Sequence, residues 1–294
     1  MPSAHTRGIT LHYDTHGPED GPAVVLVMGL ATQMTAWRPG FCAQLASRGF
    51  RVVRFDNRDV GLSTKLHGAP RPSIPRALLM RRLGLMPSAP YTLSDMARDA
   101  VGLLDHLGIE RAHVVGASMG GMIAQTMAIE HPSRVTSLVS IMSSTGDPRL
   151  PHPTAAARRM LLRPPARSRE EAIEAYVEMF RVIGSPEHFD EARLREWAGE
   201  SVDRSAYRGG VPRQLAAILA SPDRTPMLAR LRLATTVVHG TIDPLIPPAH
   251  GEATARAIPG AELTSIRGMA HDLPEPLWPR FIEAIERTAE RAGR

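Results

Sequence analysis

The spacing of hydrophobic residues along this chain switches between three patterns. Ile9, Leu11 and Tyr13 alternate with polar residues, which predicts a strand with one buried face. Residues 23–27 are apolar without interruption and are soon followed by Gly29, as expected for a short strand buried on both faces. Several later segments space their apolar residues three or four apart, which predicts amphipathic helices.

Strand and helix patterns alternate over most of the chain. The further predicted strands cover residues 51–55, 112–115, 135–142, 235–238 and 262–266. The predicted helices between them cover residues 35–48, 92–107, 119–130, 247–257 and 277–291. Thr92 with Asp95 resembles a capping box, and Gly108 is placed to end that helix. This alternation predicts an α/β fold with a mostly parallel central sheet flanked by helices.

The alternation stops between two of the predicted strands. Residues 145–231 contain no strand pattern, and proline-rich breaks such as Pro164-Pro165 separate their helical segments. These helices are predicted at residues 154–162, 169–183, 187–199 and 211–220. We therefore expect residues 1–144 and 232–294 to form the core domain and residues 145–231 an inserted helical cap. A loop over residues 71–90, with a short helix at 76–83, is expected beside it.

Composition places the chain among ordinary globular proteins. Of its 294 residues, 43% are apolar and 22% charged, which is enough for a substantial core. Only 4% are aromatic, so aliphatic residues and 14 Met must fill the interior. Most of these Met residues are expected in the core, although a Met-rich wall would give a pocket that adapts to varied ligands.

Charge and cysteine content exclude several classes of function. The net charge of +5 comes from Arg residues dispersed among acids, without the basic and aromatic runs of a nucleic-acid surface. Cys42 is the only cysteine, so neither an internal disulfide nor a Cys-based metal site can form, and a buried, inert thiol is expected. Residues 1–10 lack the apolar centre of a signal peptide, and no run of about 18 apolar residues is present. These features predict a cytoplasmic enzyme without a membrane partner.

A G-x-S-x-G motif lies at Gly116-Ala117-Ser118-Met119-Gly120. The motif alone is common, but here it directly follows a buried strand and directly precedes a helix. In such an elbow the two glycines leave room for a tight turn, and the serine projects above the carboxyl edge of the sheet. The helix N-terminus beside the Ser118 hydroxyl favours negative charge. The alternative is an ordinary turn in which Ser118 caps the helix.

Along the chain come a strand, the G-x-S-x-G motif, a helix, the helical insertion, an Asp and a His. This order of elements and residues resembles the α/β-hydrolase fold over nearly the whole chain. That fold orders its triad Ser, Asp, His. The resemblance implies Ser118 as nucleophile, Asp243 after the strand at 235–238 as acid, and His271 after the last strand as base. Ser is a weak nucleophile at neutral pH and needs such a base, which in turn needs an orienting acid.

Rival residues remain for the acid and the base. Asp147 follows the preceding strand, a position that some members of the fold use for the acid. His239 ends a strand near the site, where packing and hydrogen bonding under the acid loop are expected of it. The remaining histidines are expected in strands, in helices or at helix ends, or, for His5, His67 and His152, in loops remote from the elbow.

The resemblance also implies an oxyanion hole of two backbone N–H groups, from Met119 and from Leu30 in the Met28-Gly29-Leu30 loop. Most relatives carry His-Gly where this chain has Met-Gly. In that detail, and in a D-x-R-D-x-G-x-S loop at residues 56–63, the chain is similar to the aclacinomycin methylesterase branch. We interpret the charged residues of this loop as a structural, ion-paired turn.

These residues predict a serine esterase that hydrolyses a carboxylic ester, a small molecule, through an acyl-enzyme and without a metal or organic cofactor. Hydrolysis of a C–C bond, lactone or amide and a perhydrolase side activity are alternatives on the same triad, and a ligand receptor on this fold is another. Haloalkane dehalogenases are disfavoured and epoxide hydrolases are excluded, because both carry Asp where this chain has Ser118. The apolar pocket walls are predicted from Met28, Trp37 and Met142, with Leu30 and Met119. A homodimer through the cap helices is an alternative to a buried contact between cap and core.

Overall fold

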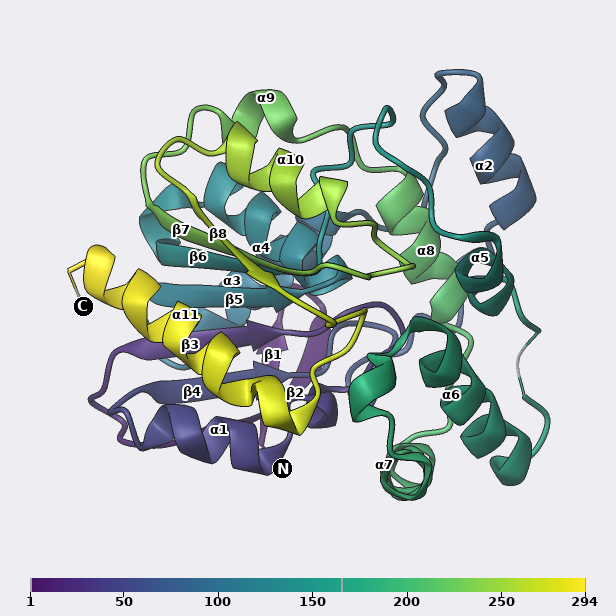
Figure 1. Cartoon of the computed structure of the whole chain (residues 1–294), viewed down its shortest axis with the longest axis horizontal. Coiled ribbons are helices and arrows are strands. Elements are labelled where there is room, and N and C mark those ends of the chain that lie inside the picture. The colour runs from purple at the N-terminus through teal and green to yellow at the C-terminus, as the bar shows by residue number, and fades with distance from the viewer. Residues whose placement is uncertain (1, 165, 294) are drawn as a thin grey trace.

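The computed structural model describes residues 2–164 and 166–293, and within them the chain is built around one sheet (Figure 1). Its eight strands lie in the order β1-β2-β4-β3-β5-β6-β7-β8. The pairs β1–β2 and β2–β4 are antiparallel and all the others are parallel. The strands are β1 Ser3–Thr6, β2 Ile9–His16, β3 Ala23–Val27, β4 Arg51–Phe55, β5 Ala112–Ala117, β6 Val135–Ile141, β7 Ala234–Gly240 and β8 Glu262–Ile266.

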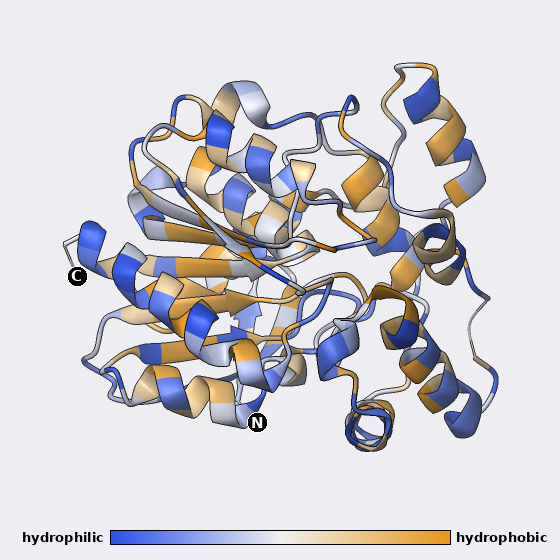
Figure 2. Ribbon diagram, in the orientation of Figure 1, coloured by the Kyte–Doolittle hydropathy of each residue, from blue (hydrophilic) through white to orange (hydrophobic). Residues whose placement is uncertain are grey.

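Helices cover both faces of this sheet, as the sequence predicts. Apolar side chains of α1 and α11 pack on one face, and those of α3 and α4 pack on the other. The 14-residue α11 buries residues three or four apart, from Trp278 to Ala289, and its remaining side chains are exposed or partly exposed. Figure 2 shows the same division, with orange strands inside and blue segments along the outside of α11. These core helices are α1 Pro39–Ala46, α3 Leu93–His106, α4 Met119–Glu130, α10 Ala249–Ala257 and α11 Trp278–Arg291.

The α/β-hydrolase fold class is confirmed, and most elements lie within a few residues of their predicted positions. The capping box at Thr92 and Asp95 is present, and Gly108, with φ of +65°, follows the end of α3. The predicted helix at 35–48 is divided into a 3₁₀ turn, Met34–Ala36, and α1. Pro39 explains the division, because the residue before a proline is forced out of helical geometry, and Arg38 is extended with ψ of 149°.

Two elements at the periphery were not predicted. The strand β1 is only four residues long and buries one side chain, Ala4, so it has almost no hydrophobic pattern. Its presence also corrects the expectation that His5 lies in a loop. The four-residue helix α9, Thr225–Leu228, contacts α4 and α10.

The segment between β6 and β7 contains helices and no strand among its described residues, in line with the sequence. Its helices are α5 Ala155–Leu161, α6 Arg169–Ile183, α7 Glu191–Arg204 and α8 Val211–Leu219, followed by α9. Helix α7 begins a few residues later than predicted, because Pro186–His188 forms a 3₁₀ turn and Asp190 caps the helix through the N–H of Arg193. Figure 1 shows α5 to α8 together at the right of the sheet, with α2, Ile74–Arg82, beside α8.

The described residues contain neither a membrane-spanning helix nor a cluster of metal-ligating side chains. None of the helices over residues 2–164 and 166–293 is both long and apolar enough to cross a membrane. Within the same ranges, no three or more His, Cys, Asp or Glu side chains are gathered as metal ligands would be.

Candidate active site

Ser118 lies between β5 and α4 in a backbone conformation that few residues adopt. Its φ is +57° and its ψ is −122°, and its N–H donates to the carbonyl of Ile141 at 2.9 Å. A Cβ at Gly116 would collide with the Gly120 carbonyl, and a Cβ at Gly120 would collide with that of Val27. The two glycines therefore allow the close packing of strand and helix that a tight elbow requires.

Three side chains that are far apart in the sequence form a continuous hydrogen-bonded line. The distance from Ser118 Oγ to His271 Nε2 is 3.0 Å, and that from His271 Nδ1 to Asp243 Oδ2 is 2.7 Å. With the proton on Nδ1, His271 donates to the carboxylate and its Nε2 accepts the proton of the serine hydroxyl. This arrangement can activate a serine for nucleophilic attack.

The loop after β7 holds Asp243 in place and keeps it ionised. Its Oδ1 accepts hydrogen bonds from the N–H groups of Leu245, at 2.9 Å, and Ile246, at 2.8 Å. Burial raises the pKa of this carboxyl, but the charge and hydrogen bond of His271 and the N–H of Ile246 outweigh it, so the pKa lies below its usual range. His239 packs under the loop as predicted, with Nε2 2.8 Å from the Ile246 carbonyl oxygen.

The loop that carries His271 is tied to the end of α6. The N–H of His271 donates to the carbonyl of Ile183 at 2.8 Å, and the N–H of Ala270 donates to Ser185 Oγ at 2.9 Å. Ser185 in turn donates through its N–H and its hydroxyl to the carboxylate of Asp272. Sequence reasoning missed Ser185, because nothing in the local pattern links a serine after a helix to a histidine loop far along the chain.

The two residues predicted as N–H donors, Leu30 and Met119, lie in the wall of the pocket over Ser118. A Cβ at Gly29 would lie 3.1 Å from that of Ser118. No protein acceptor is bonded to the N–H of Leu30 or Met119 in the described part of the chain. The next N–H, of Ala31, donates to Gln214 Oε1 at 2.8 Å and so fixes the loop from α8, a contact that the sequence did not reveal.

A pocket of about 490 Å³ opens over Ser118 and His271. Met28 and Met142 line it as predicted. Trp37 does not, which corrects the prediction: its ring is 1% exposed and packs in the core, 5.3 Å from the Phe41 ring. The wall is nonetheless rich in methionine, with side chains from the strand ends, α4, α5 and α6. These are Met28, Met119, Met122, Met142, Met160 and Met179.

The charged loop after β4 forms the ion pairs that were predicted for it. Arg58 binds Asp99 of α3 through two hydrogen bonds of 2.6 Å. Asp59 binds Arg213 of α8 through two of 2.8 Å. Both interactions have the two-pronged geometry that makes guanidinium–carboxylate pairs strong and directional.

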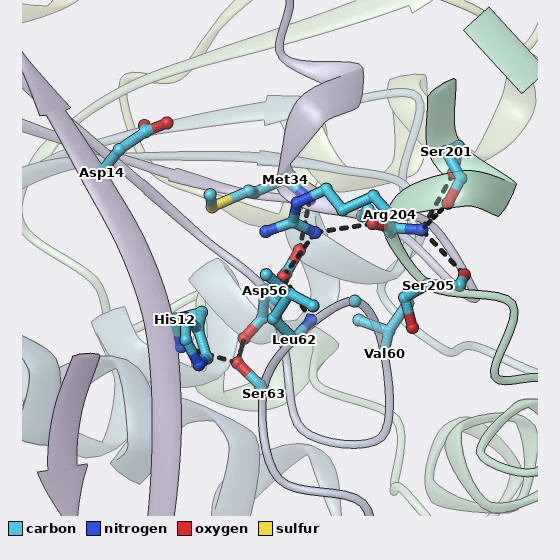
Figure 3. Close-up of polar contacts among 12 residues, drawn as sticks. His12, Asp14, Met34, Asp56, Val60, Leu62, Ser63, Ser201, Arg204 and Ser205 are labelled. Atoms are coloured by element: carbon cyan, nitrogen blue, oxygen red, sulfur yellow. Dashed lines mark hydrogen bonds and ion pairs between the residues drawn. The ribbon is translucent and has the colours of Figure 1, made fainter. Parts of the chain in front are cut away.

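Asp56 connects the same loop to α7 (Figure 3). Its Oδ2 lies 2.8 Å from Arg204 Nη1, and its Oδ1 accepts from the N–H of Met34 at 2.8 Å. Arg204 also donates to Gln33 Oε1 at 2.6 Å, and Gln33 Nε2 donates to the carbonyl of Ser201. This buried network therefore ties the loops after β3 and β4 to one helix of the insertion.

The remaining candidates lie away from the line of Ser118, His271 and Asp243. Asp147 is bonded to its neighbour Arg149, which lowers the pKa of its carboxyl, and forms no contact with His271. Cys42 is buried, and burial raises the pKa of its thiol to about 12, in line with the expectation of an inert residue.

Comparison with known proteins finds a family and several curated relatives that this chain resembles. The model of the alpha/beta hydrolase fold family matches residues 22–275. Among curated proteins, rhodomycin D methylesterase DauP of Streptomyces sp. (strain C5) is 30% identical over 290 residues, covering 88% of this chain and 89% of that protein. The putative carbamate hydrolase RutD of Variovorax paradoxus is 38% identical over 131 residues, covering 45% and 41% respectively.

Solved structures show the same fold. The enol-lactonase from Burkholderia xenovorans LB400 superposes with a TM-score of 0.75 at 22% identity, covering 98% of this chain and all of the other. A meta-cleavage product hydrolase from Pseudomonas fluorescens IP01 gives a TM-score of 0.73 at 21% identity, covering 99% and 98%. At these identities the likeness concerns the architecture alone.

Proposed function

The chain belongs to the α/β-hydrolase fold family and is a hydrolase, and from this premise we propose that it cleaves a carboxylic ester through an acyl-enzyme on Ser118. One observation carries the proposal. A hydrogen-bonded line runs from Ser118 through His271 to Asp243, and Ser118 lies in a pocket of about 490 Å³. Leu30 and Met119 line the same pocket, and their N–H groups have no acceptor within residues 2–164 and 166–293.

In the proposed reaction, His271 Nε2 takes the proton of the Ser118 hydroxyl as Oγ attacks the ester carbonyl. The negative charge that develops on the carbonyl oxygen is stabilised by the N–H groups of Leu30 and Met119, together with the N-terminus of α4. The Asp243 carboxylate holds the ring through Nδ1 and stabilises its protonated form. His271 then gives the proton to the leaving alcohol and later takes one from the water that hydrolyses the acyl-enzyme.

The division of the chain follows from the same site. We propose residues 1–144 and 232–294 as the core that carries the reacting groups, and residues 145–231 as a cap that shapes the pocket. Side chains of α5, α6, α7 and α8 line the pocket opposite Ser118, which supports that role. Helix α9 lies at the boundary, since it packs on α4 and α10 of the core.

The substrate is proposed to be a small-molecule ester with a small alcohol part. DauP, which covers most of this chain at 30% identity, is described as a methylesterase. The pocket volume lies within the usual range for small-molecule sites, and its walls are mainly apolar and methionine-rich, so they can adapt to the rest of the molecule.

The test compares wild type with Ser118→Ala on methyl esters and on p-nitrophenyl esters of increasing acyl length. Turnover by wild type with a loss of about 10³-fold or more in the variant supports the proposal. A fluorophosphonate probe gives a second readout, because it labels an activated serine whether or not the right ester is present. Labelling without ester turnover would instead favour a C–C bond, lactone or amide as the substrate. Absence of both would overturn the proposed role of Ser118.

A further inference from the structure

One cation in the wall of the pocket has no counter-ion. Arg208 lies in the loop between α7 and α8, lines the pocket and is partly buried. In the described part of the chain its guanidinium has neither a hydrogen bond nor an ion pair, although its carbonyl accepts from the N–H of Val211 at 3.2 Å. No carboxylate acts electrostatically on the guanidinium. Burial lowers the pKa of its guanidinium, since a charged group loses hydration there without gaining a partner. Keeping such a charge in a pocket is unfavourable unless a ligand supplies the anion.

Tyr176 of α6 presents a second unused donor in the same wall. Its hydroxyl has no hydrogen-bond partner among the described residues, although its ring packs 4.8 Å from that of Phe180. Burial raises the pKa of the hydroxyl to about 12, with Arg208 and Arg38 close enough to oppose that rise. The phenol therefore keeps its proton at neutral pH and can donate it to an anion beside Arg208.

The other charged side chains of the pocket are already engaged. Arg38 pairs with Glu200 at 2.9 Å, and Arg193 pairs with Glu275. Asp272 accepts hydrogen bonds from Ser185, and Asp190 accepts from the N–H of Arg193 as the cap of α7. Within the described residues that line the pocket, Arg208 is therefore the permanently charged group left for a ligand.

The segment that leads into Arg208 is anchored at two residues, Ser205 and Tyr207. The N–H of Ser205 donates to Ser201, and its carbonyl accepts from Gln33 Nε2 at 3.2 Å. The hydroxyl of Tyr207 accepts from Arg213 at 2.6 Å, so the Asp59–Arg213 pair holds the residue next to Arg208. A guanidinium carried by an anchored loop is preorganised, which lowers the entropic cost of binding an anion.

We propose that Arg208 and Tyr176 form a carboxylate-binding subsite, so that the substrate is an ester that also carries a free carboxylate. A planar guanidinium and a carboxylate form two parallel hydrogen bonds, and the Tyr176 hydroxyl supplies a third donor. The monoester of a dicarboxylic acid is the simplest molecule of this class. The inference rests on the proposed function, because it assigns the part of the substrate that lies away from Ser118.

The experiment uses monomethyl esters of dicarboxylic acids of increasing chain length, each paired with its uncharged dimethyl ester. The readout is the ratio of kcat/KM for the monoester to kcat/KM for the diester. Wild type is expected to prefer the monoester at the chain length that spans the distance from Ser118 to Arg208. Arg208→Met is expected to lower this ratio by about tenfold or more, and Tyr176→Phe by about threefold.

Two further variants separate the subsite from general effects on the pocket. Arg169→Met also removes an arginine of the helical segment, but one that lies outside the pocket and pairs with Asp203 at the surface, and it is expected to change the ratio by less than about twofold. Arg208→Lys keeps the positive charge but loses the two parallel N–H donors of the guanidinium. Its ratio is therefore expected to fall between those of wild type and Arg208→Met. A thermal melt shows whether each variant is folded. If Arg208→Met does not fold, Arg208→Lys still tests the subsite.

Failure of the inference can be distinguished from failure of the proposed function. Ester hydrolysis with the same ratio in wild type and both Arg208 variants would overturn the subsite and leave the esterase proposal intact. If no ester is hydrolysed, calorimetric titration of Ser118→Ala with the monoesters tests the subsite by itself. Binding that weakens about tenfold when Arg208→Met is added supports the subsite without the esterase, and binding unaffected by that change overturns it.

Discussion

Two loops at the carboxyl edge of the sheet each bury an aspartate, and the two aspartates differ in their partners. Asp243 follows β7 and is bonded to His271, whereas Asp59 follows β4 and is bonded to Arg213 and to the hydroxyl of Tyr91. Both are almost inaccessible, at 3% and 2% exposure. In both cases burial raises the pKa of the carboxyl and the hydrogen-bonding partners lower it to below its usual value.

The comparison shows that the partner decides whether a buried carboxylate has a chemical or a structural role. A histidine exchanges its proton near neutral pH, so a carboxylate that orients it can support proton transfer. An arginine stays charged at any physiological pH, and the hydrogen bonds of Asp59 raise the pKa of Arg213 further. The Asp59–Arg213 pair is therefore permanent, and it links the core to α8.

The largest expected effect is on catalysis and comes from removing the charge of Asp243. Asp243→Asn is expected to lower kcat by about 10⁴-fold, because the amide favours the wrong histidine tautomer while the geometry is kept. Asp59→Asn is the matched change in the other loop, and it is expected to lower the turnover of an uncharged ester per folded molecule far less, since Asp59 bonds to Arg213 and Tyr91 and to none of the reacting groups. Ester turnover per folded molecule, with the folded fraction taken from circular dichroism, compares the two. An equal loss of ester turnover per folded molecule in both variants would show that the two aspartates do not differ in their role in catalysis.

The next effect is on stability and concerns the partner of Asp59. Arg213→Met is expected to lower the free energy of unfolding by about 3–5 kcal/mol, because it leaves a buried carboxylate without its counter-ion. Adding Asp59→Asn to it is expected to recover part of this loss, since the uncompensated charge is then gone. Urea unfolding of both single variants and the double variant measures the coupling. Simple additivity of the two single changes would argue against a direct ion pair.

A smaller effect appears in the pH dependence of the same pair. The folded-state pKa of Asp59 is depressed, so its contribution to stability is fully present above its unfolded pKa of about 4 and is lost as pH falls through the folded pKa. The difference in unfolding free energy between wild type and Asp59→Asn is therefore expected to be largest at neutral pH and to narrow below about pH 4. A difference that stays constant down to the acid-unfolding transition would contradict this assignment.

The smallest effect is expected from an ion pair of similar geometry at the surface. Arg169 and Asp203 form hydrogen bonds of 2.6 and 2.8 Å between α6 and α7, but both side chains are about half exposed. Replacing either by Ala is expected to leave the melting temperature unchanged within error, because solvent screens such a pair and ordering the side chains costs entropy. If either Ala variant lowered the melting temperature as much as Arg213→Met does, burial would not explain the difference in stability between the two ion pairs.

Much of the core and the line of three side chains could be predicted because their signals are local. The buried strands are short apolar runs between turn residues, and Ser118 lies in a motif with its own strand and helix. Asp243 and His271 each follow a strand, at the positions where the resemblance to the α/β-hydrolase fold implies the acid and the base.

The missed features depend on contacts between distant segments. Ser185 fixes the histidine loop, Gln214 fixes the loop of Leu30, and Arg208 is notable only because no acid lies near it. No local pattern in the sequence contains that information. Trp37 was predicted as an apolar pocket wall, but it follows the 3₁₀ turn over residues 34–36 and its ring packs in the core.

The burial of Cys42 has a practical consequence. The only thiol of this chain is inaccessible in the folded protein, with its pKa raised to about 12, so maleimide reagents have no reactive site in the folded enzyme. A single cysteine placed at an exposed position of α6 would therefore be a unique attachment point for a fluorophore or a spin label. A second cysteine introduced on α11 would give a pair of labels without replacement of any other residue. The distance between the two labels, measured with and without an ester, would then report any movement of α6 relative to the core.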